Sequence, residues 1–317
     1  MLQPAILAVF LEFTSTAFAM SAAGLALLVI GLLAAKNDIT QARGIDKVAH
    51  LCFAIPLAVF GAEHLSSAKF MLNMVPSYMP LRLFWVYFVG FALIAAALSV
   101  ATKIQVRWSG LLLGTMMFLF VAMLHIPGAI AAGGRLAWTI VLRELSFGGA
   151  AWVLAGIAMG GNRDGQRNSL ITVGRVLIAI AAIVFGVQHF LHPLGLPGVP
   201  LQKEMPTWVP ARAFIDYLTG AFLIVAGVCF LLARKTRMAA TYLGAWIVLL
   251  VLVIYGPVLI GALADPSTSV KVEGLNYFAD TLLFGGAILS LARATPPIPS
   301  GKTIGTHNGA ILTERDS

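Results

Sequence analysis

The sequence predicts an all-α integral membrane protein with about nine transmembrane helices: one leading helix and two parallel four-helix repeats. Three observations predict this fold class. Of the 317 residues, 59% are hydrophobic and 11% are charged, whereas soluble proteins have about 45–50% and about 25%. The apolar residues form continuous runs of the length that a bilayer requires, about 20 residues. Finally, two long stretches of the chain match each other in sequence.

The apolar runs predict helices that cross the membrane one after another along the chain. Because the runs are continuous and do not alternate with polar residues, they argue against a strand barrel. The last segment is rich in Pro, Gly and Thr and has no amphipathic period, which predicts a disordered cytoplasmic tail. The nine expected spans are residues 4–35, 46–64, 83–101, 108–130, 137–159, 169–191, 213–233, 239–263 and 275–293.

Basic residues occur in alternate loops between these runs, as the positive-inside rule requires of cytoplasmic loops. They form four groups: Lys36, Arg43 and Lys47; Lys103 and Arg107; Arg163 and Arg167; and Arg234, Lys235 and Arg237. The other connections, 65–82, 131–136, 192–212 and 264–274, have fewer basic residues and are expected outside. We therefore expect the N-terminus outside and the C-terminus inside. The net charge of +8 then reflects membrane orientation, and no aromatic and basic patch suggests nucleic-acid binding.

Residues 76–127 align with 206–257 without gaps at an offset of 130, with fifteen identities. The matches include three prolines, two arginines and a tyrosine, which shared apolar composition does not explain. Upstream, Val59-Phe60-Gly61-x-x-His64 matches Val184-Phe185-Gly186-x-x-His189 at an offset of 125, and downstream Phe147-Gly148-Gly149-Ala150 matches Phe284-Gly285-Gly286-Ala287 at 137. These matches predict a duplication.

Each predicted copy holds four spans, so both copies have the same orientation in the membrane. Such copies form a parallel repeat, related by a pseudo-twofold axis along the bilayer normal. The expected organisation is a leading helix and basic loop (1–44), a first repeat (45–168), a second repeat (169–294) and the cytoplasmic tail (295–317).

The motif Val-Pro-x-x-x-Pro, followed by Phe-x-x-Tyr-x-x-Gly and a last helix with Phe-Gly-Gly, resembles the DoxX-like family of four-helix membrane proteins. Residues 45–159 and 170–293 each resemble one such unit. The family often has a Lys-Asp pair before the Gly-Gly. Here the second copy has Ala279-Asp280, and in the first copy Arg143 takes the position of the acid.

This resemblance implies a redox-associated, quinone-linked membrane subunit in the bacterial cytoplasmic (inner) membrane. Such a subunit is non-catalytic or depends on a redox protein partner, with quinone as a possible ligand. The residues themselves leave other functions open. These are a small-molecule permease, in which Pro56 is the candidate for a helix break inside a span, a lipid-binding membrane protein, and an assembly scaffold without a ligand.

Ionisable residues within spans are costly and are therefore candidates for function. The polar candidates fall near the outer ends of the helices in both copies, where they either pair with one another at the membrane interface or form ligand pockets. In the first copy they are Glu63, His64, Arg82, His125, Arg143 and Glu144; in the second they are Gln188, His189, His192, Arg212, Asp216, Tyr217, Tyr255 and Asp280.

For the first copy we assign roles. His64 and His125 are expected to be hydrogen-bond or proton partners, and Glu63 is expected to orient a ligand or accept a proton. Arg82 is expected to anchor an anion or a carbonyl group. No spacing of cysteines or histidines indicates a metal site or covalent haem attachment, since Cys52 and Cys229 lie far apart inside apolar runs.

Overall fold

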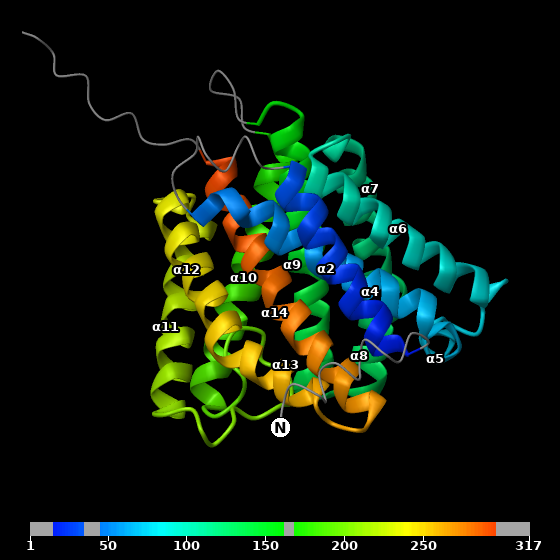
Figure 1. Ribbon diagram of the computed structural model, residues 1–317. Helices are drawn as coiled ribbons and strands as arrows, with labels where there is room; N and C mark the ends of the chain where they lie inside the picture. Colours follow the sequence, from blue (N-terminus) through cyan, green and yellow to red (C-terminus); the bar gives the residue numbers. More distant parts are fainter. Residues whose placement is uncertain (1–14, 35–44, 162–167, 296–317) are drawn as a thin grey trace, which may run out of the picture.

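The computed structural model describes residues 15–34, 45–161 and 168–295 (Figure 1). Within these ranges the regular structure is helical, apart from one isolated β-bridge between Gly195 and Glu204. Nine helical segments of this part of the chain are long and apolar enough to cross a bilayer. They are α2 (Thr16–Ala34), α4 (Ala49–Ser66), α6 (Arg82–Thr102), Val106–Ala132 (α7, η3 and α8), α9 (Gly134–Ala158), α10 (Ser169–Leu191), α11 (Arg212–Leu231), Thr236–Leu263 (α12, η4 and α13) and α14 (Thr268–Ala294).

These helices confirm the predicted all-α membrane fold with nine spans, and the chain is an integral membrane protein by length and composition. One boundary was wrong: α14 begins at Thr268, although 264–274 was expected to be a connection. Its first two turns carry polar residues that an apolar run does not include. Residues 4–14 and 35 of the first predicted span, and 296–317 of the predicted tail, lie outside the described residues.

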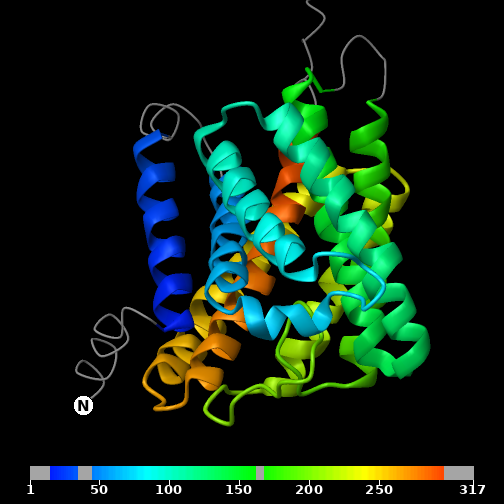
Figure 2. The ribbon, with the colours of Figure 1, turned by 90° about the vertical axis from the view of Figure 1, so that its right-hand side faces the viewer.

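Eight of the spans form two packed layers (Figure 1). One layer has the order α6, α4, α14, α12, and the other has the order α7, α9, α10, α11. The turns α6–α7 and α11–α12 close the two ends, while α9 packs on α14 across the centre. The remaining span, α2, lies at the outside of the bundle against α4, α6 and α14 (Figure 2).

Glycines allow the closest contacts between helices within each layer. A Cβ on Gly286 of α14 would lie 2.5 Å from the backbone N of Phe53 in α4, and one on Gly174 of α10 would lie 2.1 Å from the carbonyl O of Gly149 in α9. Small residues let membrane helices pack backbone to backbone in this way. The paired glycines at 148–149 and 285–286 are therefore packing positions.

The two halves of the chain, 45–161 and 168–295, share backbone details at the offset of 130. Left-handed backbone occurs at three such pairs, Leu81 and Ala211, Lys103 and Ala233, and Gln105 and Lys235. Each half also has one π-helical turn inside a span, η3 (Val121–His125) between α7 (Val106–Phe120) and α8 (Ile126–Ala132), and η4 (Val251–Tyr255) between α12 (Thr236–Leu250) and α13 (Gly256–Leu263). π-Turns interrupt helices frequently at functional sites.

The bundle has two ends with different chemistry. We call the end with the last turn of α4 and the loop 192–211 the histidine face, and the end with the turns α6–α7 and α11–α12 the basic face. The connection after α4 contains α5 (Ala68–Met71) and η2 (Leu72–Met74), whereas the corresponding loop 192–211 in the second half is irregular. Pro56 does not break its span, because α4 is continuous through it.

Candidate functional site

A cavity of about 600 Å³ opens on the histidine face between α4, α9, α14 and the loop 192–211. Its polar lining includes Glu63 of α4, Arg143 of α9, and Asn276, Tyr277 and Asp280 of α14. The apolar part of the wall is formed by Phe70, Leu136, Ile140, Leu201 and Val272. This first cavity therefore has charged residues on one part of its surface and apolar residues on the rest, as binding sites for small molecules commonly do.

Arg143 and Asp280 form an ion pair between the central helices α9 and α14. Arg143 Nη1 lies 2.7 Å from Asp280 Oδ2, and Arg143 Nη2 lies 2.8 Å from Glu144 Oε1. The side chains of Arg143 and Asp280 are 17% and 7% exposed. The two residues also correspond to each other at the offset of 137, so equivalent positions of the two halves carry opposite charges and meet. A lone charge at this depth would be strongly unfavourable, and the pairing compensates it.

A second pair of contacts joins the layers beside this ion pair. The amide of Asn276 donates to Glu63 Oε1 at 3.0 Å. In the corresponding place of the other half, the hydroxyl of Thr139 donates to Gln188 Oε1 at 3.0 Å. Glu63 and Gln188 correspond at the offset of 125, and Thr139 and Asn276 correspond at 137. Thr139 and Asn276 were missed from the sequence, because the candidates were chosen mainly as ionisable residues within spans and neither of these side chains ionises.

Two polar atoms at the first cavity have no hydrogen-bond partner among the described residues. These are Arg143 Nε, a donor, and Asn276 Oδ1, an acceptor. The orientation of the Asn276 amide follows from its contact, since its NH₂ must face the carboxylate of Glu63. Because buried polar atoms nearly always have partners, a ligand with both an acceptor and a donor would complete this site.

Two of the predicted histidines lie behind the ion pair. Glu144 is close enough to act electrostatically on both His64 and His125. Nδ1 of His64 lies 2.8 Å from the carbonyl O of Phe60 in its own helix. The described part of the chain offers His64 Nε2 and the ring nitrogens of His125 no further hydrogen bond. Arg143 therefore connects Asp280 in the cavity with Glu144 and the two imidazoles.

Arg82 is not among the residues that line the first cavity. Its guanidinium donates to the carbonyl O atoms of Val75 and Leu72, at 3.0 and 2.6 Å. Arg212, the corresponding residue, donates to the carbonyl O of Met205 at 3.0 Å. Both arginines thus hold the connection that precedes their helix, and they anchor carbonyl groups of the chain itself.

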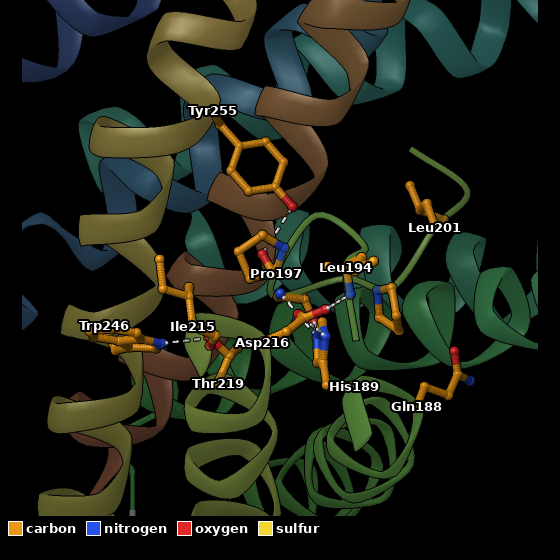
Figure 3. Close-up of polar contacts among 12 residues, drawn as sticks. Gln188, His189, Leu194, Pro197, Leu201, Ile215, Asp216, Thr219, Trp246 and Tyr255 are labelled. Carbon is orange, nitrogen blue, oxygen red and sulfur yellow. Dashed lines mark hydrogen bonds and ion pairs between the residues drawn. The ribbon is translucent and has the colours of Figure 1, made fainter. Parts of the chain in front are cut away.

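The predicted site residues of the second half hold the loop 192–211 (Figure 3). His189 Nδ1 lies 2.6 Å from Asp216 Oδ1, and both side chains are buried. Asp216 Oδ2 accepts from the backbone N of Leu194 at 2.8 Å, and His189 Nε2 accepts from the backbone N of Gly198 at 3.1 Å. Since Nε2 accepts here, the imidazole proton is on Nδ1 and points to Asp216. The hydroxyl of Tyr255 donates to the carbonyl O of Pro197 at 2.9 Å.

The same loop covers the position in the second half that corresponds to Glu63. Arg135 donates to Gln188 Oε1 at 3.3 Å, and to the carbonyl O atoms of Pro200 and Leu201 at 3.0 and 3.4 Å. Tyr217 is 41% exposed, and its ring stacks on Phe190 with centroids 5.6 Å apart. The loop 192–211 is therefore held in place by the polar residues His189, Arg212, Asp216 and Tyr255.

Comparisons of the chain with models of protein families, with curated proteins and with solved structures found no match. Within the described ranges, no group of three or more His, Cys, Asp or Glu side chains is arranged to bind a metal ion. The site around the first cavity brings together one guanidinium, four carboxylates (Glu63, Glu144, Glu273 and Asp280), an amide, a phenol and, close to Glu144, two imidazoles.

Proposed function

We propose that this protein is a membrane-embedded binding subunit for a quinone-type head group, and that it depends on a redox protein partner for electrons. The observation that carries the proposal is the first cavity, where a buried Arg143–Asp280 pair and two buried polar atoms without partners lie beside an apolar wall. This combination suits a ligand with a polar ring and an apolar body.

The residues present fit such a head group. Arg143 Nε is free to donate to a carbonyl oxygen, and Asn276 Oδ1 is free to accept from a hydroxyl group. Phe70, Leu136 and Ile140 offer apolar surface to a hydrophobic tail. A quinone, when bound, supplies two-electron, two-proton chemistry between its carbonyl and hydroxyl forms.

The charges around the cavity support a role in proton exchange. Glu63, Glu144 and Asp280 are three carboxylates around Arg143, the one permanently charged cation among them, while the fourth carboxylate, Glu273, pairs with Lys203. Within a membrane an excess of two negative charges is unfavourable, so this cluster favours the uptake of protons. His64 and His125 lie within electrostatic reach of Glu144 and are candidates to exchange protons with it.

The wider assignment to DoxX-like proteins is part of this proposal. The recurrence of left-handed residues, π-turns and the arginine contacts at the offset of 130 supports a duplicated unit. The basic face carries Lys103, Arg107, Arg234 and Lys235, which supports a cytoplasmic position for it by the positive-inside rule. The first cavity would then open to the outside of a bacterial inner membrane.

Binding of a short-chain benzoquinone to the purified protein in lipid nanodiscs tests the proposal. We expect saturable binding, and we expect Asn276→Leu to weaken it about tenfold, the effect of about one lost hydrogen bond. Thr139→Val is the matched control, since it changes the corresponding residue where the loop covers the site; its affinity should stay within about twofold. Absence of saturable binding, or equal effects of the two variants, would overturn the proposal.

A further inference from the structure

A second cavity, of about 550 Å³, opens on the basic face. It lies between the α6–α7 turn, the first turn of α4, and the last turns of α9 and α14. Lys103, Arg107 and Arg293 bring three cationic side chains to its lining, with Gln105 beside them. None of the described residues that line it is a carboxylate. The cavity therefore has two guanidinium groups, those of Arg107 and Arg293, at the end of the membrane spans.

The two arginines of this cavity lack an anionic partner within the described part of the chain. Arg293 is half-buried in the last turn of α14, and no hydrogen bond or ion pair joins it to another described residue. The guanidinium of Arg107 lies 5.5 Å from the ring centroid of Trp108, a cation–π contact. Arg107 is exposed, and the half-buried guanidinium of Arg293 has donors available for charge-assisted hydrogen bonds to an anion.

The corresponding arginine of the second half has partners within the chain. Arg237 corresponds to Arg107 at the offset of 130, and it donates to the carbonyl O atoms of Ala292 and Thr295 at 3.1 Å each. Phe230, which is fully buried, stands where the first half has the smaller Val100. In the second half the arginine thus caps the end of a helix, whereas Arg107 contacts no carbonyl or carboxylate of the described chain.

We propose that the second cavity binds the phosphate group of an anionic phospholipid. Basic pockets between membrane helices bind such head groups, and arginines contact phosphate oxygens through paired donors. The surface next to the basic turn is apolar, with Ile104, Trp108 and Leu112 exposed by 65%, 52% and 66%. Acyl chains can lie along this surface while the phosphate enters the cavity, which favours a lipid over a soluble anion.

The test uses delipidated, full-length protein in neutral detergent, with lipid binding measured by native mass spectrometry. Short-chain phosphatidylglycerol, phosphatidylcholine and inorganic phosphate are compared. We expect phosphatidylglycerol to bind at least about tenfold more tightly than phosphatidylcholine, and Arg293→Gln to reduce its affinity about tenfold. Arg107→Gln gives the same test should Arg293→Gln fold poorly. Arg234→Gln is the matched control, because it removes one exposed positive charge from the same face outside the cavity.

The outcomes separate the sources of the phosphate. Equal binding of the two lipids, or equal losses in Arg293→Gln and Arg234→Gln, would mean that surface charge alone attracts lipids and would overturn the proposal. Inorganic phosphate that displaces phosphatidylglycerol at similar concentration would assign the cavity to a soluble anion, which also overturns it. The result is independent of quinone binding, since the first cavity lies at the opposite end of the bundle.

Discussion

Removing the charge of Arg143 should destabilise the protein more than any other single change to a polar residue around the first cavity. Arg143 contacts two carboxylates, Asp280 at 2.7 Å and Glu144 at 2.8 Å. Arg143→Gln leaves both without a cation in a buried, membrane-embedded position. Asp280→Asn is milder, because Arg143 then keeps Glu144 as its partner.

The size of the effect follows from the burial of the pair. Breaking a buried ion pair by removing one partner costs about 3–5 kcal/mol, and we expect this loss in the free energy of unfolding for Arg143→Gln. For Asp280→Asn we expect about 1–3 kcal/mol, the cost of a weakened buried hydrogen bond. In the double variant the two amides can bond to each other, so the losses should fall short of their sum by about 2 kcal/mol.

The assay is equilibrium unfolding in mixed micelles, followed by circular dichroism for the three variants and the wild type. The exposed pair of Lys203 and Glu273 is the internal control. Its atoms are 3.1 Å apart, but the side chains are 30% and 47% exposed, so Lys203→Gln should cost at most about 1 kcal/mol. An Arg143→Gln loss no larger than that of Lys203→Gln, or strictly additive losses in the double variant, would refute the reasoning.

Three further predictions concern packing, the loop and topology. Gly61→Ala should lower the free energy of unfolding by about 1–3 kcal/mol, because the new methyl group would lie 2.9 Å from the carbonyl O of Gly90 in α6. Gly128→Ala is the control: a methyl group there meets open space, so this variant should be as stable as the wild type in the same denaturation assay. Asp216→Asn leaves one acceptor oxygen for His189 Nδ1 and the backbone N of Leu194, which use two in the wild type, and it removes the negative charge beside the histidine. Tryptic cleavage after Lys203 should therefore accelerate about tenfold as the loop 192–211 opens more often; an unchanged cleavage rate would contradict the structural role of the pair. In a background without native cysteines, Lys203→Cys and Lys235→Cys should react with a membrane-impermeant maleimide from opposite sides of sealed vesicles, since only α11 separates them; reaction from the same side would rule out α11 as a span.

The sequence was sufficient to predict the number and positions of the spans. Lipid requires a continuous apolar run for each helix, so composition along the chain follows the membrane directly. The start of α14 was missed because its first turns are polar and so do not belong to an apolar run. Its first turns, from Thr268 to Gly274, include Lys271 and Glu273, and a helix that continues beyond the hydrocarbon core leaves no trace in an apolar run.

The partners of the site residues could not be predicted from the sequence. Glu63 and Asp280 are both visible as ionisable groups within spans, but their contacts depend on how the halves pack. Each half contributes two helices to each layer, so α4 packs on α14 of the other half. Asn276 therefore meets Glu63 across 213 residues of sequence, and Arg143 meets Asp280 across 137. Only the layered arrangement brings these pairs together.

The roles of the two halves differ because a few equivalent positions have different residues. Where the first half has Val86, the second has Asp216, which fixes His189 and through it the loop 192–211. Where the first half has His125, the second has Tyr255, whose hydroxyl binds the same loop. Asp216 and Tyr255 therefore both stabilise the loop 192–211 at the histidine face.

In the first half, the corresponding histidines keep nitrogen atoms that the described chain does not engage, next to Glu144. A duplicated bundle with two identical halves would place like charges opposite each other at the central α9–α14 contact. Arg143 and Asp280 instead carry opposite charges at equivalent positions and pair, which removes the repulsion. The difference between the halves at this pair is thus what allows two charged side chains to meet at the packed centre of a membrane bundle.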